Sequence, residues 1–121
     1  MSWVLAIETS TMSGSVALGD GKRVLAEIVI PLERRQNEAL LPALHALLPR
    51  QSAPPDEIAA VVIGAGPGPF RGLRIAAATA KGFAHALRIP VHAYSGLLAA
   101  AFELHDKATT ICALFDARRN E

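Results

Sequence analysis

The stretch AAVVIGAGPGPFRGLRIAAATAKGFAHAL, residues 59–87, decides the fold of this chain. Its first part, Ala59–Ile63, is a short apolar run that predicts a buried strand. A loop rich in glycine and proline, Gly64–Phe70, comes next. The segment Gly72–Leu87 then predicts a helix, which ends before Pro90. A strand, a loop and a helix in this order are typical of a sheet with helices packed on its faces.

The flanking sequence extends this pattern into a mixed sheet. Three β-rich runs precede the stretch, and the turn Gly19–Lys22 joins two of them as a hairpin, because glycine tolerates the positive φ of tight turns. Alternating strands and helices follow, so we expect a three-strand antiparallel meander and then α/β units. The further elements predicted are strands Val4–Ile7, Ser13–Leu18 and Val24–Ile30, helix Asn37–Leu48, strand Ile89–Tyr94, helix Gly96–Leu104 with Ser95 as N-cap, and strand Thr109–Phe115.

The end of the chain predicts the beginning of a second domain. The last predicted strand follows a helix, and the polar segment Arg118–Glu121 resembles a turn that leads to another strand. We therefore expect residues 1–95 to form one domain and residues 96–121 to open a second, truncated one.

Composition excludes several classes of protein. The 12 basic and 11 acidic residues give a net charge of +1, so the chain alone is expected to bind nucleic acid poorly. No apolar run is long enough to cross a membrane, and the N-terminus lacks the features of a signal peptide. The single cysteine, Cys112, is expected to be a buried small hydrophobe, and the absence of a disulfide framework fits a cytoplasmic protein.

The loop Gly64–Phe70 occupies the position of phosphate-binding loops but lacks their motifs. No Lys-Ser or Lys-Thr pair follows it, and position 69, where a dinucleotide loop needs glycine, is proline. Its two prolines also remove two N–H donors. Phosphate binding near Gly66 and Gly68 stays open, but a rigid corner between strand and helix is favoured.

The opening strand ends in Glu8-Thr9-Ser10-Thr11, an acid followed by three hydroxyls. This group is either a site for a metal–phosphate, with Thr9 and Ser10 near the ligand, or a solvated turn whose hydroxyls bond local backbone; the solvated turn is favoured.

The helix Gly72–Leu87 carries two rows of small residues at four-residue spacing. Either the flanking elements of the domain cover this apolar helix or a second subunit does. If a subunit does, a bulky residue at Ala76 or Ala80 is expected to block association and leave the fold intact. Leu73, Ile75, Phe83 and Leu87 are expected to face the sheet. The rows are Gly72, Ala76, Ala80 and Ala84, and Ala78, Gly82 and Ala86.

No residue pattern indicates catalysis. The four histidines, expected at the surface, have no zinc spacing, and there is no nucleophile elbow or Cys/His pair. Asp116 ends the last predicted strand, where a salt-bridged turn with Arg118 and Arg119 is favoured over a catalytic role.

Four segments together closely resemble the TsaB (YeaZ) family, formerly grouped with the M22 glycoproteases. The resemblance covers the whole chain and implies the actin/Hsp70-like fold (ASKHA, related to RNase H). The segments are Leu5–Thr11, Ser15–Leu18, Gly66–Ile75 and Asp116–Arg118.

The resemblance also implies a function. It predicts a non-catalytic dimerisation subunit, without cofactor or metal, that pairs with a TsaD-type catalytic subunit and a TsaE-type ATPase to make N6-threonylcarbamoyladenosine on tRNA. Such a subunit forms a homodimer when alone and meets tRNA only through the complex. An alternative is a nucleotide-binding ASKHA-type enzyme, although Glu8–Thr11 has no glycine of the ATP-binding pattern. The partner-binding residues expected on the two helices are Leu40, Leu44, Leu47, Gly72, Ala76, Ala80 and Ala84.

Three positions depart from the family pattern. Pro69 and Arg71 stand where the family usually has Ser and Thr, which weakens a hydroxyl role and adds a cation. Asn37 stands where the family often has His.

Overall fold

A computed structural model describes residues 3–9, 13–30, 36–50, 55–68 and 70–114. Within these residues five strands form one mixed sheet in the order β3-β2-β1-β4-β5. β1 pairs antiparallel with β2, which pairs antiparallel with β3, whereas β1–β4 and β4–β5 are parallel. The strands are β1 (Trp3–Glu8), β2 (Gly14–Gly19), β3 (Val24–Ile30), β4 (Ile58–Gly64) and β5 (Val91–Tyr94).

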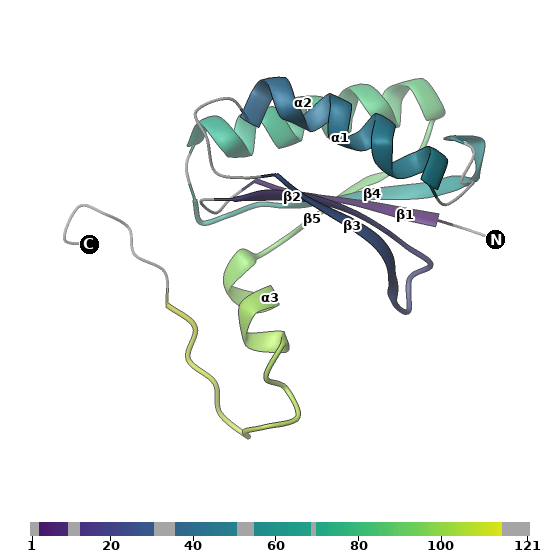
Figure 1. Cartoon of the computed structure of the whole chain (residues 1–121). Coiled ribbons are helices and arrows are strands. Elements are labelled where there is room, and N and C mark those ends of the chain that lie inside the picture. Colours follow the sequence, from purple (N-terminus) through teal and green to yellow (C-terminus); the bar gives the residue numbers. More distant parts are fainter. Residues whose placement is uncertain (1–2, 10–12, 31–35, 51–54, 69, 115–121) are drawn as a thin grey trace.

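Two long helices cover one face of this sheet. Figure 1 shows α1 and α2 side by side above the strands, whereas α3 leaves the sheet on the opposite side. The helices are α1 (Gln36–Arg50), the 3-10 turn η1 (Pro55–Glu57), α2 (Phe70–Leu87) and α3 (Gly96–Phe102). The predicted mixed sheet with flanking helices is therefore confirmed, and α1 continues through Pro42 in its second turn.

The predicted hairpin between β2 and β3 is confirmed in detail. Gly21 has φ +90°, a value that glycine adopts without a Cβ penalty. The Asp20 carboxylate accepts the backbone N–H groups of Lys22 at 2.9 Å and Arg23 at 3.1 Å, and these bonds lower the pKa of Asp20. The turn residues therefore fix the register of the meander locally.

Two predictions for the C-terminal part are wrong. Residues 109–114 form no strand, because α3 leads the chain away from the sheet (Figure 1), so this segment does not pair with the edge strand β5. Cys112 is exposed, not buried, for the same reason. The Ser95 cap is confirmed, since its hydroxyl accepts the Leu98 N–H at 3.3 Å; α3 ends at Phe102.

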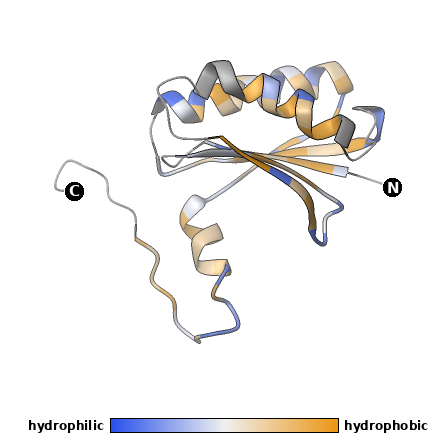
Figure 2. Cartoon of the chain, viewed as in Figure 1, coloured by the Kyte–Doolittle hydropathy of each residue, from blue (hydrophilic) through white to orange (hydrophobic). Residues whose placement is uncertain are grey.

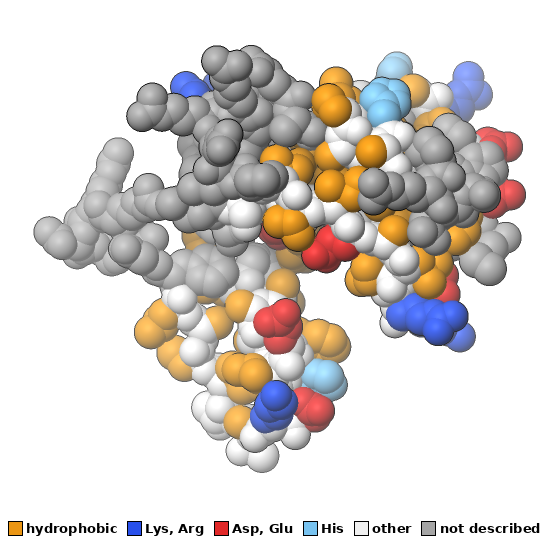
Figure 3. Space-filling view, in the orientation of Figure 1, with side chains coloured by type: hydrophobic (Ala, Val, Ile, Leu, Met, Phe, Trp, Pro, Cys, Tyr) orange, Lys and Arg blue, Asp and Glu red, His pale blue; other side chains and the backbone are white. Residues whose placement is uncertain are grey.

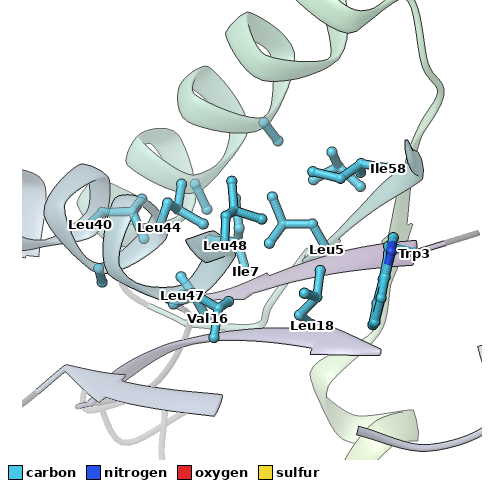
Figure 4. Close-up of a cluster of buried hydrophobic side chains, with 14 of the residues drawn as sticks. Trp3, Leu5, Ile7, Val16, Leu18, Leu40, Leu44, Leu47, Leu48 and Ile58 are labelled. Atoms are coloured by element: carbon cyan, nitrogen blue, oxygen red, sulfur yellow. The ribbon is translucent and has the colours of Figure 1, made fainter. Parts of the chain in front are cut away.

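The core lies between the sheet and the two long helices. β1 and β2 alternate buried and half-buried residues, the period of a strand with one face on a core. Figure 4 shows leucines of α1 pointing at the inward side chains of β1 and β2. Each fully buried aliphatic side chain contributes about 1.5–3 kcal/mol of transfer free energy. The largest fully buried aliphatic side chains are Leu5, Ile7, Val16, Leu18, Leu40, Leu44, Leu47 and Val61.

Apolar side chains are also exposed away from this core. Figure 2 shows α3 as apolar along its length, below the sheet. Leu98 is 67% exposed and Phe102 is 65% exposed, and Leu114 is 84% exposed. A contiguous patch of exposed apolar side chains commonly indicates a contact surface.

Candidate functional site

The carboxyl ends of the parallel strands bring an acid and a phenol together. Glu8 ends β1 and Tyr94 ends β5, and both strands flank β4. The Tyr94 hydroxyl donates a hydrogen bond to Oε2 of Glu8, across 86 positions of sequence. Open α/β sheets commonly place their functional residues at these carboxyl ends of the strands.

Gly64, the last residue of β4, makes room for this pair. It lies between the other two strand ends, opposite Tyr94 in the β4–β5 register. A Cβ at Gly64 would stand 2.6 Å from the carboxyl carbon of Glu8, closer than real Cβ contacts. The absence of a side chain here is therefore what lets Glu8 reach Tyr94.

The environment of Tyr94 keeps its phenol protonated. Partial burial, together with the hydrogen bond to Glu8 and the charge of that carboxylate, raises the pKa of Tyr94 well above its ordinary value. Tyr94 therefore stays a hydrogen-bond donor at physiological pH.

The loop after β4 is tied to the start of α3. The Ala65 N–H donates to the Tyr94 carbonyl at 2.8 Å, and the Gly96 N–H donates to the Gly66 carbonyl at 2.8 Å. Gly66 has φ +97° and precedes a cis bond to Pro67. Because Ala65 uses its N–H on Tyr94 and Pro67 has none, this arrangement supports a rigid corner over a phosphate cradle.

The residues proposed to lie near a phosphate differ in their burial. Thr9 is 1% exposed, and its hydroxyl donates to the Gly72 carbonyl at 2.6 Å in the first turn of α2. Thr9 is therefore buried and bonds backbone 63 positions away, so the favoured interpretation of a solvated turn with local bonds is wrong for Thr9. Gly66 is buried and Gly68 is exposed. Ser10 lies outside the described residues.

The inner rows of α1 and α2 face the core of their own domain. Leu40, Leu44 and Leu47 are each 1% exposed, and Ala76 and Ala80 are fully buried. Gly72 is also buried, and Ala84 is 5% exposed. None of these residues can reach a partner while the helices keep these positions.

Two predictions about α2 therefore change. Its small residues, not its large ones, lie deepest, since a shallow helix face lets the axis approach the sheet closely. Leu73, Ile75, Phe83 and Leu87 are half-buried, and the last three pack against the core from beside that contact, in keeping with the prediction. Because Ala76 and Ala80 are fully buried, we now expect a bulky residue at either site to destabilise the fold instead of sparing it.

The second small row has the opposite orientation. Ala78, Gly82 and Ala86 are all exposed, and a Cβ at Gly82 would meet nothing within 4 Å. On α1, Leu41 is 52% exposed and His45 is exposed. These residues form the outer face of the two-helix layer.

Sequence reasoning missed Tyr94 and Gly64. A signal was present, because Glu8 and Tyr94 both end predicted strands, and Tyr94 is the only tyrosine of the chain. Their contact follows only once β1, β4 and β5 are known to be parallel neighbours.

The described residues contain neither a metal cluster nor a membrane helix. No three His, Cys, Asp or Glu residues among them gather around one point. Within the same ranges no helix has the length and apolar character to cross a membrane. The four histidines, His45, His85, His92 and His105, are exposed, as predicted.

Comparison with known proteins places this architecture in one family. The family model described as TsaD, tRNA N6-adenosine threonylcarbamoyltransferase, matches residues 23–121. The chain is 34% identical over 118 residues to the tRNA threonylcarbamoyladenosine biosynthesis protein TsaB of Bacillus subtilis, covering 98% of this chain and 52% of that protein. The TsaB protein of Haemophilus influenzae is 37% identical, with 98% and 50% covered.

Solved structures agree with the sequence matches. YeaZ from Pseudomonas aeruginosa superimposes with a TM-score of 0.87 at 36% identity, covering 98% of this chain and 56% of that one. Two proteins of Thermus thermophilus share only the fold with this chain. RuvC superimposes with a TM-score of 0.56 at 13% identity, and the ROK hexokinase superimposes with a TM-score of 0.55 at 23% identity. The predicted RNase H-like, ASKHA-type domain is thereby confirmed.

The chain spans about half the length of the curated relatives that it matches. The matched family model covers most of the chain, and the relatives quoted above carry the TsaB or YeaZ name. The chain therefore belongs to the TsaD family of glycoprotease-like proteins, within its TsaB/YeaZ group.

Proposed function

We propose that this chain is a non-catalytic subunit that pairs with a TsaD-type catalytic subunit to form N6-threonylcarbamoyladenosine on tRNA. The observation that carries the proposal is the 34–37% identity, along 98% of the chain, to proteins named for this biosynthesis. The proposal includes a TsaE-type ATPase as a further partner, a homodimer when the subunit is alone, and a cytoplasmic location.

The outer face of α1 and α2 is the proposed contact with the catalytic subunit. Gly82 supports this assignment on energetic grounds. A glycine inside a helix costs about 0.5–1 kcal/mol relative to alanine, and no atom of the described residues requires one at this position. With Ala78 and Ala86 it leaves a shallow surface on which a partner helix can approach closely, and Leu41 adds exposed apolar area.

The test uses Gly82→Leu in the full-length protein, with Gly82→Ala as the matched control. Both variants are expected to fold, because the site is open. The wild type and Gly82→Ala are expected to co-purify with the TsaD-type subunit and, with the TsaE-type ATPase, to support threonylcarbamoyladenosine formation. Gly82→Leu is expected to lose both.

Two results would contradict the proposal. One is modification of tRNA at the full rate by the other subunits without this protein. The other is tight binding and turnover of ATP by the full-length protein alone, which would favour a nucleotide-binding enzyme.

The proposal extends to domain organisation. Residues 1–95 would form the first domain and residues 96–121 would open a second one. The exposed Leu98, Phe102 and Leu114 support this division, since a following domain would cover them. Slow amide hydrogen exchange in α3 of the full-length protein is the expected result, and fast exchange there would contradict it.

A further inference from the structure

The chain leaves the sheet at residues 94–96, where β5 ends and α3 begins. Within α3 only Gly96 is buried, whereas Leu98 and Phe102 are mostly exposed. Figure 3 shows this helix and the residues after it as a lobe below the body of the molecule, with apolar and charged side chains on its surface. Among the described residues, the direction of this lobe is therefore set where it begins, in a segment that we call the junction (residues 94–96).

Two backbone hydrogen bonds attach the junction to the loop after β4. The Ala65 N–H donates to the Tyr94 carbonyl at 2.8 Å. The Gly96 N–H donates to the Gly66 carbonyl at 2.8 Å. Because both bonds end on adjacent residues of one loop, they form a single point of attachment. By themselves they leave the junction able to pivot about that loop.

The side chain of Tyr94 gives the junction a second point of attachment. Its hydroxyl donates a hydrogen bond to Glu8 at the end of β1, and β4 lies between β1 and β5 in the sheet. The attachment to the loop is therefore separate from the attachment to β1. Two separate points of attachment oppose a pivot about either one, in the way that a fully paired polar network makes a structure rigid.

The Glu8–Tyr94 bond lies on the face of the sheet that points away from α1 and α2. Successive side chains of a strand point to opposite faces. Ile7 is buried in the core, so Glu8 points to the other face. Val91 pairs with the buried Val61, and Tyr94, three positions later, also points to the other face. Because α3 leaves the sheet on this same side (Figure 1), the bond stands beside the departing helix.

We propose that Tyr94 is a positioning residue that fixes the angle between the sheet and α3, together with the domain that α3 leads into. The inference rests on the proposed function in one respect, because it uses the proposed division between residues 1–95 and a second domain. It goes beyond that proposal by naming the contact that holds the two domains at one angle. A fixed angle preorganises the subunit, since less freedom is lost when a partner binds.

Gly64 is a second requirement of this arrangement. The three atoms nearest to a Cβ at this position all belong to the Glu8 carboxylate, and all lie closer than real Cβ contacts. Gly64→Ala is therefore expected to push the Glu8 side chain away from Tyr94. This substitution breaks the attachment to β1 without removing a polar group.

The test measures the distance between two spin labels in the full-length protein by double electron–electron resonance. The labels are attached through Lys22→Cys, in the β2–β3 hairpin, and Glu103→Cys, directly after α3; both positions are exposed. Cys112, which is exposed, and any other cysteine of the full-length protein are replaced by serine. The distance is compared between the wild-type junction, Tyr94→Phe and Gly64→Ala.

Glu57→Ala is the matched control. It removes the bond that the Trp3 indole N–H donates to Oε2 of Glu57 at 3.2 Å. This bond also joins two side chains and is also partly buried, but Trp3 is at the opposite end of β1 from Glu8. The control therefore removes a comparable bond without touching the junction.

We expect one narrow distance distribution for the wild-type junction and for Glu57→Ala. In Tyr94→Phe and Gly64→Ala, the share of molecules at other distances is expected to rise about fivefold, the shift that accompanies loss of a half-buried hydrogen bond to a charged group. Circular dichroism verifies that every variant is folded. A broad distribution in the wild type overturns the inference. So does an unchanged distribution in Tyr94→Phe, or equal broadening in Glu57→Ala.

The two proposals fail separately. The labels report on the junction in the protein alone, so the distances decide the role of Tyr94 without any partner. If the wild type does not assemble with the TsaD-type subunit, the proposed function is refuted and the distances still stand. If it assembles but shows a broad distribution, only the inference about Tyr94 is overturned.

Discussion

The Glu8–Tyr94 bond joins the ends of β1 and β5, and Tyr94→Phe removes it without changing the packing of the ring. A hydrogen bond to a charged group contributes about 1.5–3 kcal/mol when it is well buried. Because Tyr94 is only half-buried, solvent screening reduces the expected loss to about 1 kcal/mol. For a domain of this size, that loss lowers Tm by about 3–6 °C.

A single tryptophan reports on the unfolding of this chain. Trp3 is its single tryptophan and is 8% exposed, so its fluorescence follows unfolding in denaturant. Glu8→Gln keeps the size of the side chain and removes its charge. A double-mutant cycle of Glu8→Gln and Tyr94→Phe is expected to give a coupling free energy of about 0.5–1 kcal/mol.

The pH dependence follows from the raised pKa of Tyr94. Because folding raises this pKa above the unfolded value near 10, the stabilisation is fully present below pH 10 and is lost as the pH rises towards the folded pKa. The slope is at most about 1.4 kcal/mol per pH unit, and solvent exposure of Tyr94 reduces it.

Tyrosinate absorbance isolates Tyr94, because the chain has no other tyrosine. In Glu8→Gln the pKa of Tyr94 is expected to move back towards 10. A wild-type phenol that titrates like free tyrosine would contradict the coupling of Glu8 and Tyr94, and so would additive effects of Tyr94→Phe and Glu8→Gln on the free energy of unfolding.

Three other substitutions test the packing around this edge. Thr9→Val leaves the Gly72 carbonyl without its buried donor and should cost about 1–3 kcal/mol in denaturant unfolding, while a change below ~0.5 kcal/mol would contradict the role of that bond. Ala80→Leu overfills a fully buried site and should lower stability by about 1–3 kcal/mol, and a stable variant that only lost partner binding would refute the placement of this residue. Gly66→Ala places a Cβ at φ +97° and 3.2 Å from a Leu73 methyl, so the free energy of unfolding is expected to fall by at least ~1 kcal/mol. A Tm equal to that of the wild type would be inconsistent with this loop geometry.

The sequence alone determined the elements that local chemistry specifies. The turn around Gly21 and Asp20 fixes the first hairpin, and the apolar period of residues 40–48 fixes α1. The segments shared with the TsaB/YeaZ family identified the fold, since their combination is specific. The sequence also excluded the standard dinucleotide-binding loop, because position 69, where that loop needs glycine, is proline.

Tertiary structure decided which side of each element faces inward and which distant residues meet. Two small rows on α2 look alike in sequence, and only the docking of the helix on β4 shows that Ala76 and Ala80 are core while Ala78 and Gly82 are surface. Residues 109–114 have strand-like composition but are not paired with any strand of the sheet, and pairing depends on a neighbour as well as on propensity. Glu8 and Tyr94 meet for a similar reason: the parallel register of β1, β4 and β5 brings their ends to one edge, and no local pattern encodes that register.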